Sequence, residues 1–202
     1  MLASLLVSLA LAQSAPAAPS TPSAPAVVPA APPAAAPAPL PVPRFARTTV
    51  GTCGCSLYAP PGLTFEAPTL SEDGAQVWTG EVRHGGAEAG AGWTFGAIVV
   101  KFKEPFSDAG PEQLEELLVA YMDFLRTQFE ITANAGVGRG HTHSENTGAR
   151  GVIDYWKDKV GDDWAVKGWI DKDRLAILFV AGKGDFPYFS AQQMYLEGFR
   201  FN

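Results

Sequence analysis

The sequence predicts an α+β domain over residues 44–202, an antiparallel sheet with one long and one short helix packed on it as an α/β sandwich. Three observations predict this class. Strand patterns fill most of the region before residue 104 and return after residue 130. A single long amphipathic helix pattern stands between them. The links between successive strands are too short for parallel crossovers, so the strands pair as antiparallel neighbours.

The chain ahead of this domain predicts export. Residues 1–12, "MLASLLVSLALA", form an uncharged apolar run that ends in Ala10-Leu11-Ala12, which is typical of a secretory signal cleaved before Gln13. The run is too short to span a membrane, which needs about 20 apolar residues. Residues 14–43 contain eleven prolines and eleven alanines, so we expect an extended tether over 13–43 rather than a helix.

The first half of the domain reads as a series of strands. "TCGCSLY" (52–58) alternates along its length, and Pro60-Pro61-Gly62 ends it. The further strands predicted before the helix are 63–67, 75–82 and 93–103.

One long helix is predicted over residues 111–130. Its apolar residues recur at helical spacing and form a single stripe, and Pro111 suits the first turn. Glu112, Glu115 and Glu116 lie where the positive end of the helix dipole favours acidic side chains. The stripe consists of Leu114, Leu117, Leu118, Tyr121, Leu125 and Phe129.

Strands return after the helix, followed by a shorter helix. The short helix follows "GKGD", with Pro187 early in it and Gly198 as its C-terminal stop, and a last strand follows at "FRF". The strands predicted between the two helices are 131–139, 148–159, 164–171 and 174–181.

This layout resembles the PsbP-like α/β sandwich domains, in particular those of exported bacterial proteins. The resemblance covers about residues 50–202 and rests on Pro60-Pro61-Gly62, the helix 111–130 and the ending "MYLEGFRF". It implies the sandwich fold and a binding or assembly role, and it carries over no functional residue.

Charge restricts the class of partner. The net charge is −6, and every charged residue lies after position 43. An acidic domain without a cluster of Lys and Arg is not expected to bind nucleic acid or an anionic membrane. No apolar run is long enough to insert into a membrane. We therefore expect an envelope or extracellular protein, or a glycan, as the partner.

Cys53 and Cys55 leave three alternatives open. In an extended strand their Cα atoms would lie about 6.6 Å apart, near the upper limit for a disulfide. A bond within the chain therefore requires Gly54 to allow a local turn. Both thiols otherwise point into the core beside Leu57 as small apolar groups. Exported cysteines are usually oxidised, which favours a strained bond within the chain or a bond between two chains, and a metal site is the third alternative.

A metal site would use Cys53, Cys55, His141 and His143. Thiolates and imidazoles suit zinc or copper(I), and two histidines one residue apart on a strand form a workable ligand pair. The surrounding "GRGHTHSENTG" is polar and rich in glycine, which favours instead an exposed loop with solvated histidines. No cofactor is predicted.

The aromatic residues of two strands suggest a binding surface. In 152–158 and 164–170 they are interleaved with charged residues on both faces, whereas a sheet with helices on one side should have one polar face. Such side chains anchor interfaces with partner proteins or glycans, unless the second helix or the N-terminal loop covers them. The candidate partner-binding residues are Tyr155, Trp156, Trp164 and Trp169.

No catalytic residue is predicted. The sequence contains no Gly-x-Ser-x-Gly elbow and no phosphate-binding loop, and its acidic pairs fall in hairpin turns where Asp is common. The leading hypothesis is an exported, non-enzymatic binding or accessory protein that acts through a sheet face or a loop. A metal-binding or redox accessory protein is the second hypothesis, and a hydrolytic enzyme is the third.

Overall fold

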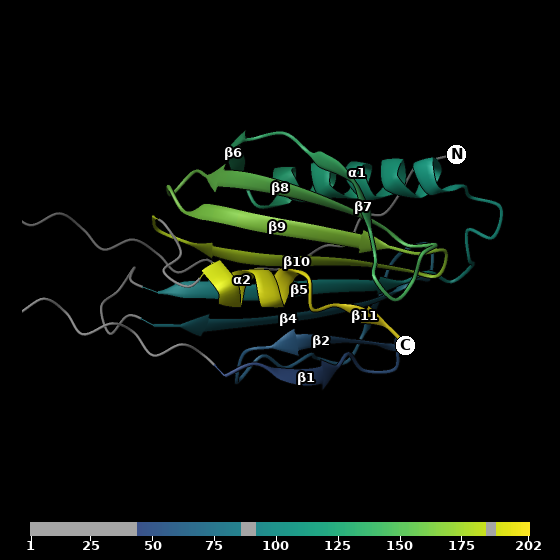
Figure 1. The fold of residues 1–202 in the computed structure, drawn as a ribbon, viewed down its shortest axis with the longest axis horizontal. Coiled ribbons are helices and arrows are strands. Elements are labelled where there is room, and N and C mark those ends of the chain that lie inside the picture. The colour runs from purple at the N-terminus through teal and green to yellow at the C-terminus, as the bar shows by residue number, and fades with distance from the viewer. Residues whose placement is uncertain (1–43, 86–91, 185–188) are drawn as a thin grey trace, which may run out of the picture.

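Two antiparallel sheets and two helices make up the fold (Figure 1). The computed structural model describes residues 44–85, 92–184 and 189–202. In chain order the elements are β1 (Ala46–Thr49), β2 (Cys55–Ala59), β3 (Thr69–Leu70), β4 (Gln76–His84), β5 (Trp93–Lys101), α1 (Pro111–Gln128), β6 (Ile131–Asn134), β7 (Gly138–Thr142), β8 (Arg150–Asp158), β9 (Asp163–Ile170), β10 (Arg174–Gly182), α2 (Phe189–Leu196) and β11 (Arg200–Phe201).

The large sheet has the strand order β3-β4-β5-β10-β9-β8-β6, and β7 also pairs with β8. The small sheet has the order β1-β2-β11. All these pairs are antiparallel, including β5 with β10, which are far apart in the sequence. The predicted α+β class, with an antiparallel sheet and two helices, is therefore confirmed.

Helix α1 covers one face of the large sheet. Its Leu114, Leu118 and Leu125 are buried against strand residues that include Val166 and Ile177. The helix begins after Gly110, whose backbone N–H donates to Gln113 Oε1 at 2.8 Å. The predicted apolar stripe thus packs as expected, although the helix ends at Gln128 rather than at residue 130.

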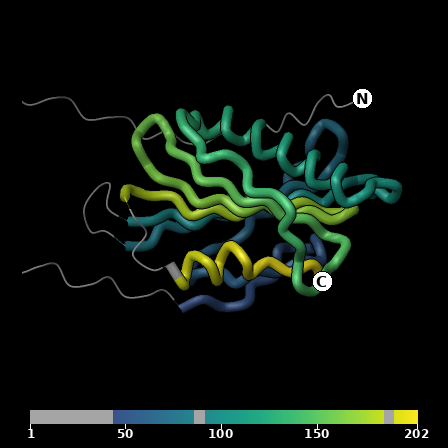
Figure 2. The backbone as a smooth tube through the Cα atoms, turned by 45° about the horizontal axis from the view of Figure 1, so that its top comes forward, coloured from purple at the N-terminus to yellow at the C-terminus, as the bar shows by residue number. Residues whose placement is uncertain are grey.

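The opposite face is covered by β2 and α2, which share a second core cluster with it. Tyr195 of α2 is fully buried, and its hydroxyl donates to Gly96 O of β5 at 2.7 Å. The two helices therefore lie on opposite sides of the large sheet (Figures 1 and 2). This arrangement explains why apolar residues point in both directions along the central strands.

The strand predicted over residues 63–67 was wrong. Leu63 is buried and Phe65 is partly buried, but this segment runs alongside β4 without forming a strand, and the short strand β3 begins only at Thr69. The backbone O of Thr64 comes so close to Gly80 that a Cβ added there would lie 2.6 Å from it. The apolar residues of this segment mark burial rather than regular pairing.

The strand predicted over residues 131–139 is two strands, β6 and β7. Both pair with β8, and the register shifts within each of them. The intervening Gly136 has a φ of +91°, which glycine adopts more readily than other residues. The chain therefore leaves the sheet after β6 and returns as β7, which contains His141.

Some expectations concern other parts of the chain. The secretory signal over 1–12, the tether over 13–43 and the position of Pro187 lie outside the described residues.

Candidate functional site

Cys53 and Cys55 form a disulfide with each other. Gly54 has a φ of +71°, so it supplies the turn that brings the two Cα atoms to 5.5 Å. Strand β2 begins only at Cys55, and both cysteines are buried. Of the three alternatives left open by the sequence, the structure has the bond within the chain. Sulfur atoms joined in this way offer no thiolate to a metal.

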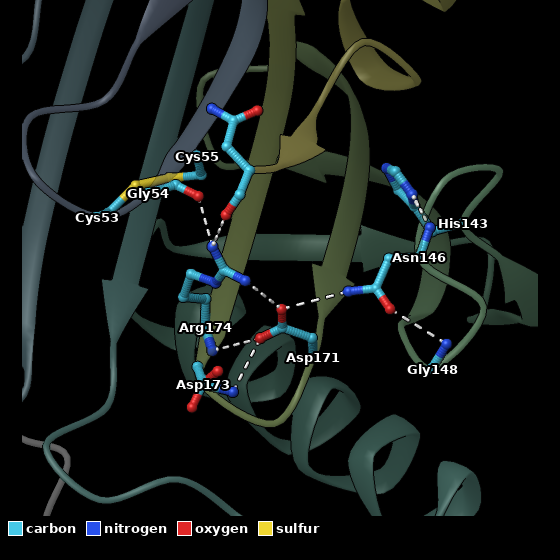
Figure 3. Close-up of polar contacts among 10 residues, drawn as sticks. Cys53, Gly54, Cys55, His143, Asn146, Gly148, Asp171, Asp173 and Arg174 are labelled. Carbon is cyan, nitrogen blue, oxygen red and sulfur yellow. Dashed lines mark hydrogen bonds and ion pairs between the residues drawn. A yellow bond between two sulfur atoms is a disulfide. The ribbon is translucent and has the colours of Figure 1, made fainter.

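The disulfide loop is fastened at Gly54 (Figure 3). Its carbonyl oxygen accepts hydrogen bonds from Arg174 Nη1 and from the backbone N–H of Asn202, the latter at 2.9 Å. Arg174 Nη2 also forms an ion pair with Asp171 Oδ2 at 2.8 Å. We call Gly54, Asp171, Arg174 and Asn202 the Arg174 clasp. It joins the disulfide loop to the β9–β10 turn and to the last residue.

His143 belongs to a loop held next to this clasp. Its Nδ1 accepts from the backbone N–H groups of Glu145 and Asn146 at 3.2 and 3.1 Å, and its Nε2 donates to Phe199 O at 2.9 Å. Asn146 Nδ2 in turn donates to Asp171 at 3.4 Å. Both ring nitrogens of this buried histidine are therefore used inside the protein.

His141 does not share that environment. It lies in β7 and is partly buried, and its pKa is lowered, first by burial and then by the positive charge of Lys167. Residues 44–85, 92–184 and 189–202 contain no group of three or more His, Cys, Asp or Glu side chains placed to hold a metal ion. The metal hypothesis for Cys53, Cys55, His141 and His143 therefore gains no ligand cluster from the fold.

The aromatic candidates separate into core and surface. Trp156 is buried under α1, where its Nε1 donates to Asp154 Oδ2 at 2.7 Å. Trp169 is buried on the opposite face, where its Nε1 donates to Leu196 O at 3.2 Å. Trp164 is partly buried between Phe129 and Phe179. Only Tyr155, with 49% of its surface exposed, presents its ring to solvent.

We call the face of the large sheet that β2 and α2 cover the α2-side face. On this face the cover extends over β9 but, in the described part of the chain, does not reach β8. Alternate residues of a strand share a face, so Ile153, Tyr155 and Lys157 of β8 lie on the same face as Lys167 of β9, with Ile153 directly opposite Lys167. Lys167 is fully buried, whereas Tyr155 and Lys157 are about half exposed. We call Ile153, Tyr155 and Lys157, together with Glu197 at the end of α2, the Tyr155 surface.

Lys167 lies at the inner border of this surface and was not singled out from the sequence. Its Nζ is 3.0 Å from Glu197 Oε1 and 4.6 Å from the centre of the Trp169 ring. Burial lowers the pKa of the Lys167 ammonium, and the Glu197 carboxylate partly offsets this change. The available signal was a lysine between Val166 and Gly168 in a strand that is apolar on both faces.

The chain matches no model of a known protein family and no curated protein. No helix in the described part of the chain is both long and apolar enough to cross a lipid bilayer.

Proposed function

We propose that this chain is an exported, non-enzymatic binding or accessory protein, and that it contacts an envelope or extracellular partner through the Tyr155 surface. The observation that carries the proposal is the exposure of Tyr155 next to the part of the same sheet face that β2 and α2 cover. A half-exposed tyrosine offers a rigid apolar ring with a polar tip, which is the kind of side chain that anchors interfaces.

Further exposed apolar side chains support this choice of surface. Val160, in the turn between β8 and β9, is 63% exposed, and Met194 of α2 is 50% exposed. By contrast, exposed Tyr58 lies under the guanidinium of Arg47 and exposed Phe106 packs against Phe102. Val160 and Met194 thus lie on elements near the Tyr155 surface, whereas Leu70 of β3, which is 72% exposed, lies at the other edge of the large sheet.

The Cys53–Cys55 disulfide supports export, because such bonds persist in oxidising compartments and are rare in the cytosol. The hydrogen bonds at both ring nitrogens of His143 give that residue a structural role. The likeness to PsbP-like domains, with their sandwich fold, belongs to the same proposal.

Site-specific photo-cross-linking tests the proposal. A photo-reactive amino acid replaces Tyr155 in the exported protein, and the matched control replaces Glu112, an exposed residue of α1 on the other side of the sheet. We expect one discrete adduct from position 155 and none from position 112. An excess of unlabelled wild-type protein should compete for the adduct, whereas the Tyr155→Ala variant should not. Equal labelling at the two positions would contradict the proposal.

A further inference from the structure

Burial of Lys167 requires an explanation. An ammonium group in the interior loses its hydration, and a buried ion pair is often no more stabilising than apolar residues of the same volume. Apart from Glu197, no hydrogen-bond partner for Lys167 Nζ lies among the described residues. An ammonium carries three donors, so a single carboxylate leaves part of its capacity unused.

Glu197 is unusual as the partner of a buried charge. Its side chain is 46% exposed, and it lies just beyond the last residue of α2. Its backbone is held by bonds to Gln193 O and from the Arg200 side chain, so the carboxylate can leave Lys167 without any change in the helix. The anion next to Lys167 can therefore exchange with solvent.

Asp154 is a buried charge with a structural role, and its contacts can be compared with those of Lys167. Its carboxylate is fully buried and accepts from the Tyr155 backbone N–H at 2.8 Å and from Trp156 Nε1 at 2.7 Å. Both donors are fixed by the sheet and the core, and Arg126 of α1 adds a charge at 3.9 Å. The one fixed group beside Lys167 Nζ in the described residues is the face of the Trp169 ring, at 4.6 Å, and the ion-pair partner Glu197 is half exposed, which distinguishes Lys167 from Asp154.

We propose that Lys167 is a carboxylate-binding site, and that an acidic side chain of the partner protein replaces Glu197 on its ammonium. The residue now in the site is itself a protein side chain, and its chemistry and size are the argument for Asp or Glu as the ligand. Tyr155 and Ile153 border the site on β8, and Ile153 is the cross-strand neighbour of Lys167. The inference rests on the proposed function, since it names the group that the Tyr155 surface recognises.

Propionate, which has the carboxylate and the same number of carbon atoms as a glutamate side chain, is the probe. Thermal unfolding is measured in sodium propionate and in sodium chloride of equal ionic strength. The full chain is compared as wild type, Glu197→Ala and the double variant Lys167→Met/Glu197→Ala. We expect propionate to raise the Tm of Glu197→Ala by about 3–5 °C relative to chloride. The rise in wild type should be smaller, because Glu197 competes, and the double variant should show none.

An equal rise in Glu197→Ala and in the double variant would overturn the inference, because the effect would not depend on the ammonium. A rise with glucuronate but not with propionate would overturn the assignment to an acidic side chain. If Glu197→Ala does not fold, Glu197→Gln replaces it with the same comparisons.

The two proposals fail separately. If position 155 gives no specific adduct, the proposal that the Tyr155 surface binds a partner is rejected, whatever the response to propionate. If a specific adduct forms but propionate has no effect, the carboxylate-binding role of Lys167 is rejected and the proposed role of the Tyr155 surface stands.

Discussion

Single side chains on the α2-side face interact through charge. His141, Lys167 and Glu197 come from β7, β9 and the end of α2, yet the charges of Lys167 and Glu197 act on His141 in opposite directions. Burial is the main reason that the pKa of His141 is lowered, the Lys167 ammonium lowers it further, and Glu197 and Glu115 raise it. The proximity of these groups can therefore be tested by titration.

We predict that Lys167→Met raises the pKa of His141 and that Glu197→Gln lowers it. The first variant removes a repelling positive charge, and the second removes an attracting negative charge. The measurement is an NMR titration of the imidazole Cε1–H resonance of His141 in wild type and in the two variants. Shifts of the same sign in both variants would contradict the placement of the three residues.

The lowered pKa of His141 also determines how this residue changes the free energy of unfolding with pH. The unfolded chain binds this proton near the ordinary pKa of histidine, whereas the folded protein binds it only at lower pH. This histidine therefore reduces the free energy of unfolding as the pH falls below its ordinary pKa. Lys167→Met should weaken that dependence.

Close packing at single glycines gives a second prediction. A Cβ added to Gly151 would lie 2.5 Å from the buried ring of Trp169, which is also held by its bond to Leu196 O. We expect Gly151→Ala to lower the free energy of unfolding by about 1–3 kcal/mol in urea titrations. The control is Gly148→Ala, where the nearest atom is 3.4 Å away and the expected change is within about 0.5 kcal/mol. Equal changes in both variants would contradict this packing.

The sequence alone could not decide how Cys53 and Cys55 are bonded or whether Lys167 is buried, and the reasons are physical. Residue spacing showed that a Cys53–Cys55 bond needs a turn at Gly54, but the φ of a glycine is set by the fold, here through the bonds that its carbonyl accepts. Lys167 looked like an ordinary strand residue, because the sequence does not show that α2 and β2 cover its face.

Among the elements, the long helix could be predicted best. Its apolar stripe has a period that only a helix brings onto one face, and the stripe packs against the sheet. By contrast, β1 was missed, because Ala46–Thr49 is short, mostly exposed and has no alternating pattern. The break between β6 and β7 was also missed, since it depends on pairing with β8 rather than on local preference.

The packing of α1 gives the prediction at this scale. Leu118 is fully buried and lies close to Gly168 of β9, whereas neighbouring Leu117 is only partly buried. We expect Leu118→Ala to cost about 2–5 kcal/mol, because it leaves a cavity between the helix and the sheet. Leu117→Ala should cost clearly less in the same urea titrations. A larger loss from Leu117→Ala would place the wrong face of α1 on the sheet.

For the molecule as a whole, covering on both sides of the large sheet decides which aromatic residues are available. Trp156 and Trp169 point in opposite directions and are both buried, one under α1 and one under α2. The sequence showed aromatic residues on both faces and left open that the second helix or the N-terminal loop covers them. It could not show that this cover is assembled from β2, α2 and β11 at the two ends of the described domain. Tyr155 is left exposed because this cover ends at β9.

The Arg174 clasp joins the two ends of the described domain to its centre, so its loss should affect distant segments together. Arg174 binds Gly54 O, Asn202 O and Asp171, and its side chain is largely buried. We predict that Arg174→Met lowers the free energy of unfolding by about 2–3 kcal/mol, because hydrogen bonds to a charged group are lost. Hydrogen exchange should speed up at the Asn202 amide, which donates to Gly54 O.

Arg139→Met is the matched control for that variant. Its guanidinium is half exposed and 3.6 Å from Glu115, so the expected cost is about 0.5 kcal/mol with no change in exchange at Asn202. Unchanged exchange at Asn202 in Arg174→Met would show that the disulfide loop holds the C-terminal strand without the arginine. Faster exchange would instead show that the arginine couples the loop, the β9–β10 turn and the last strand, since these segments lie far apart in the sequence.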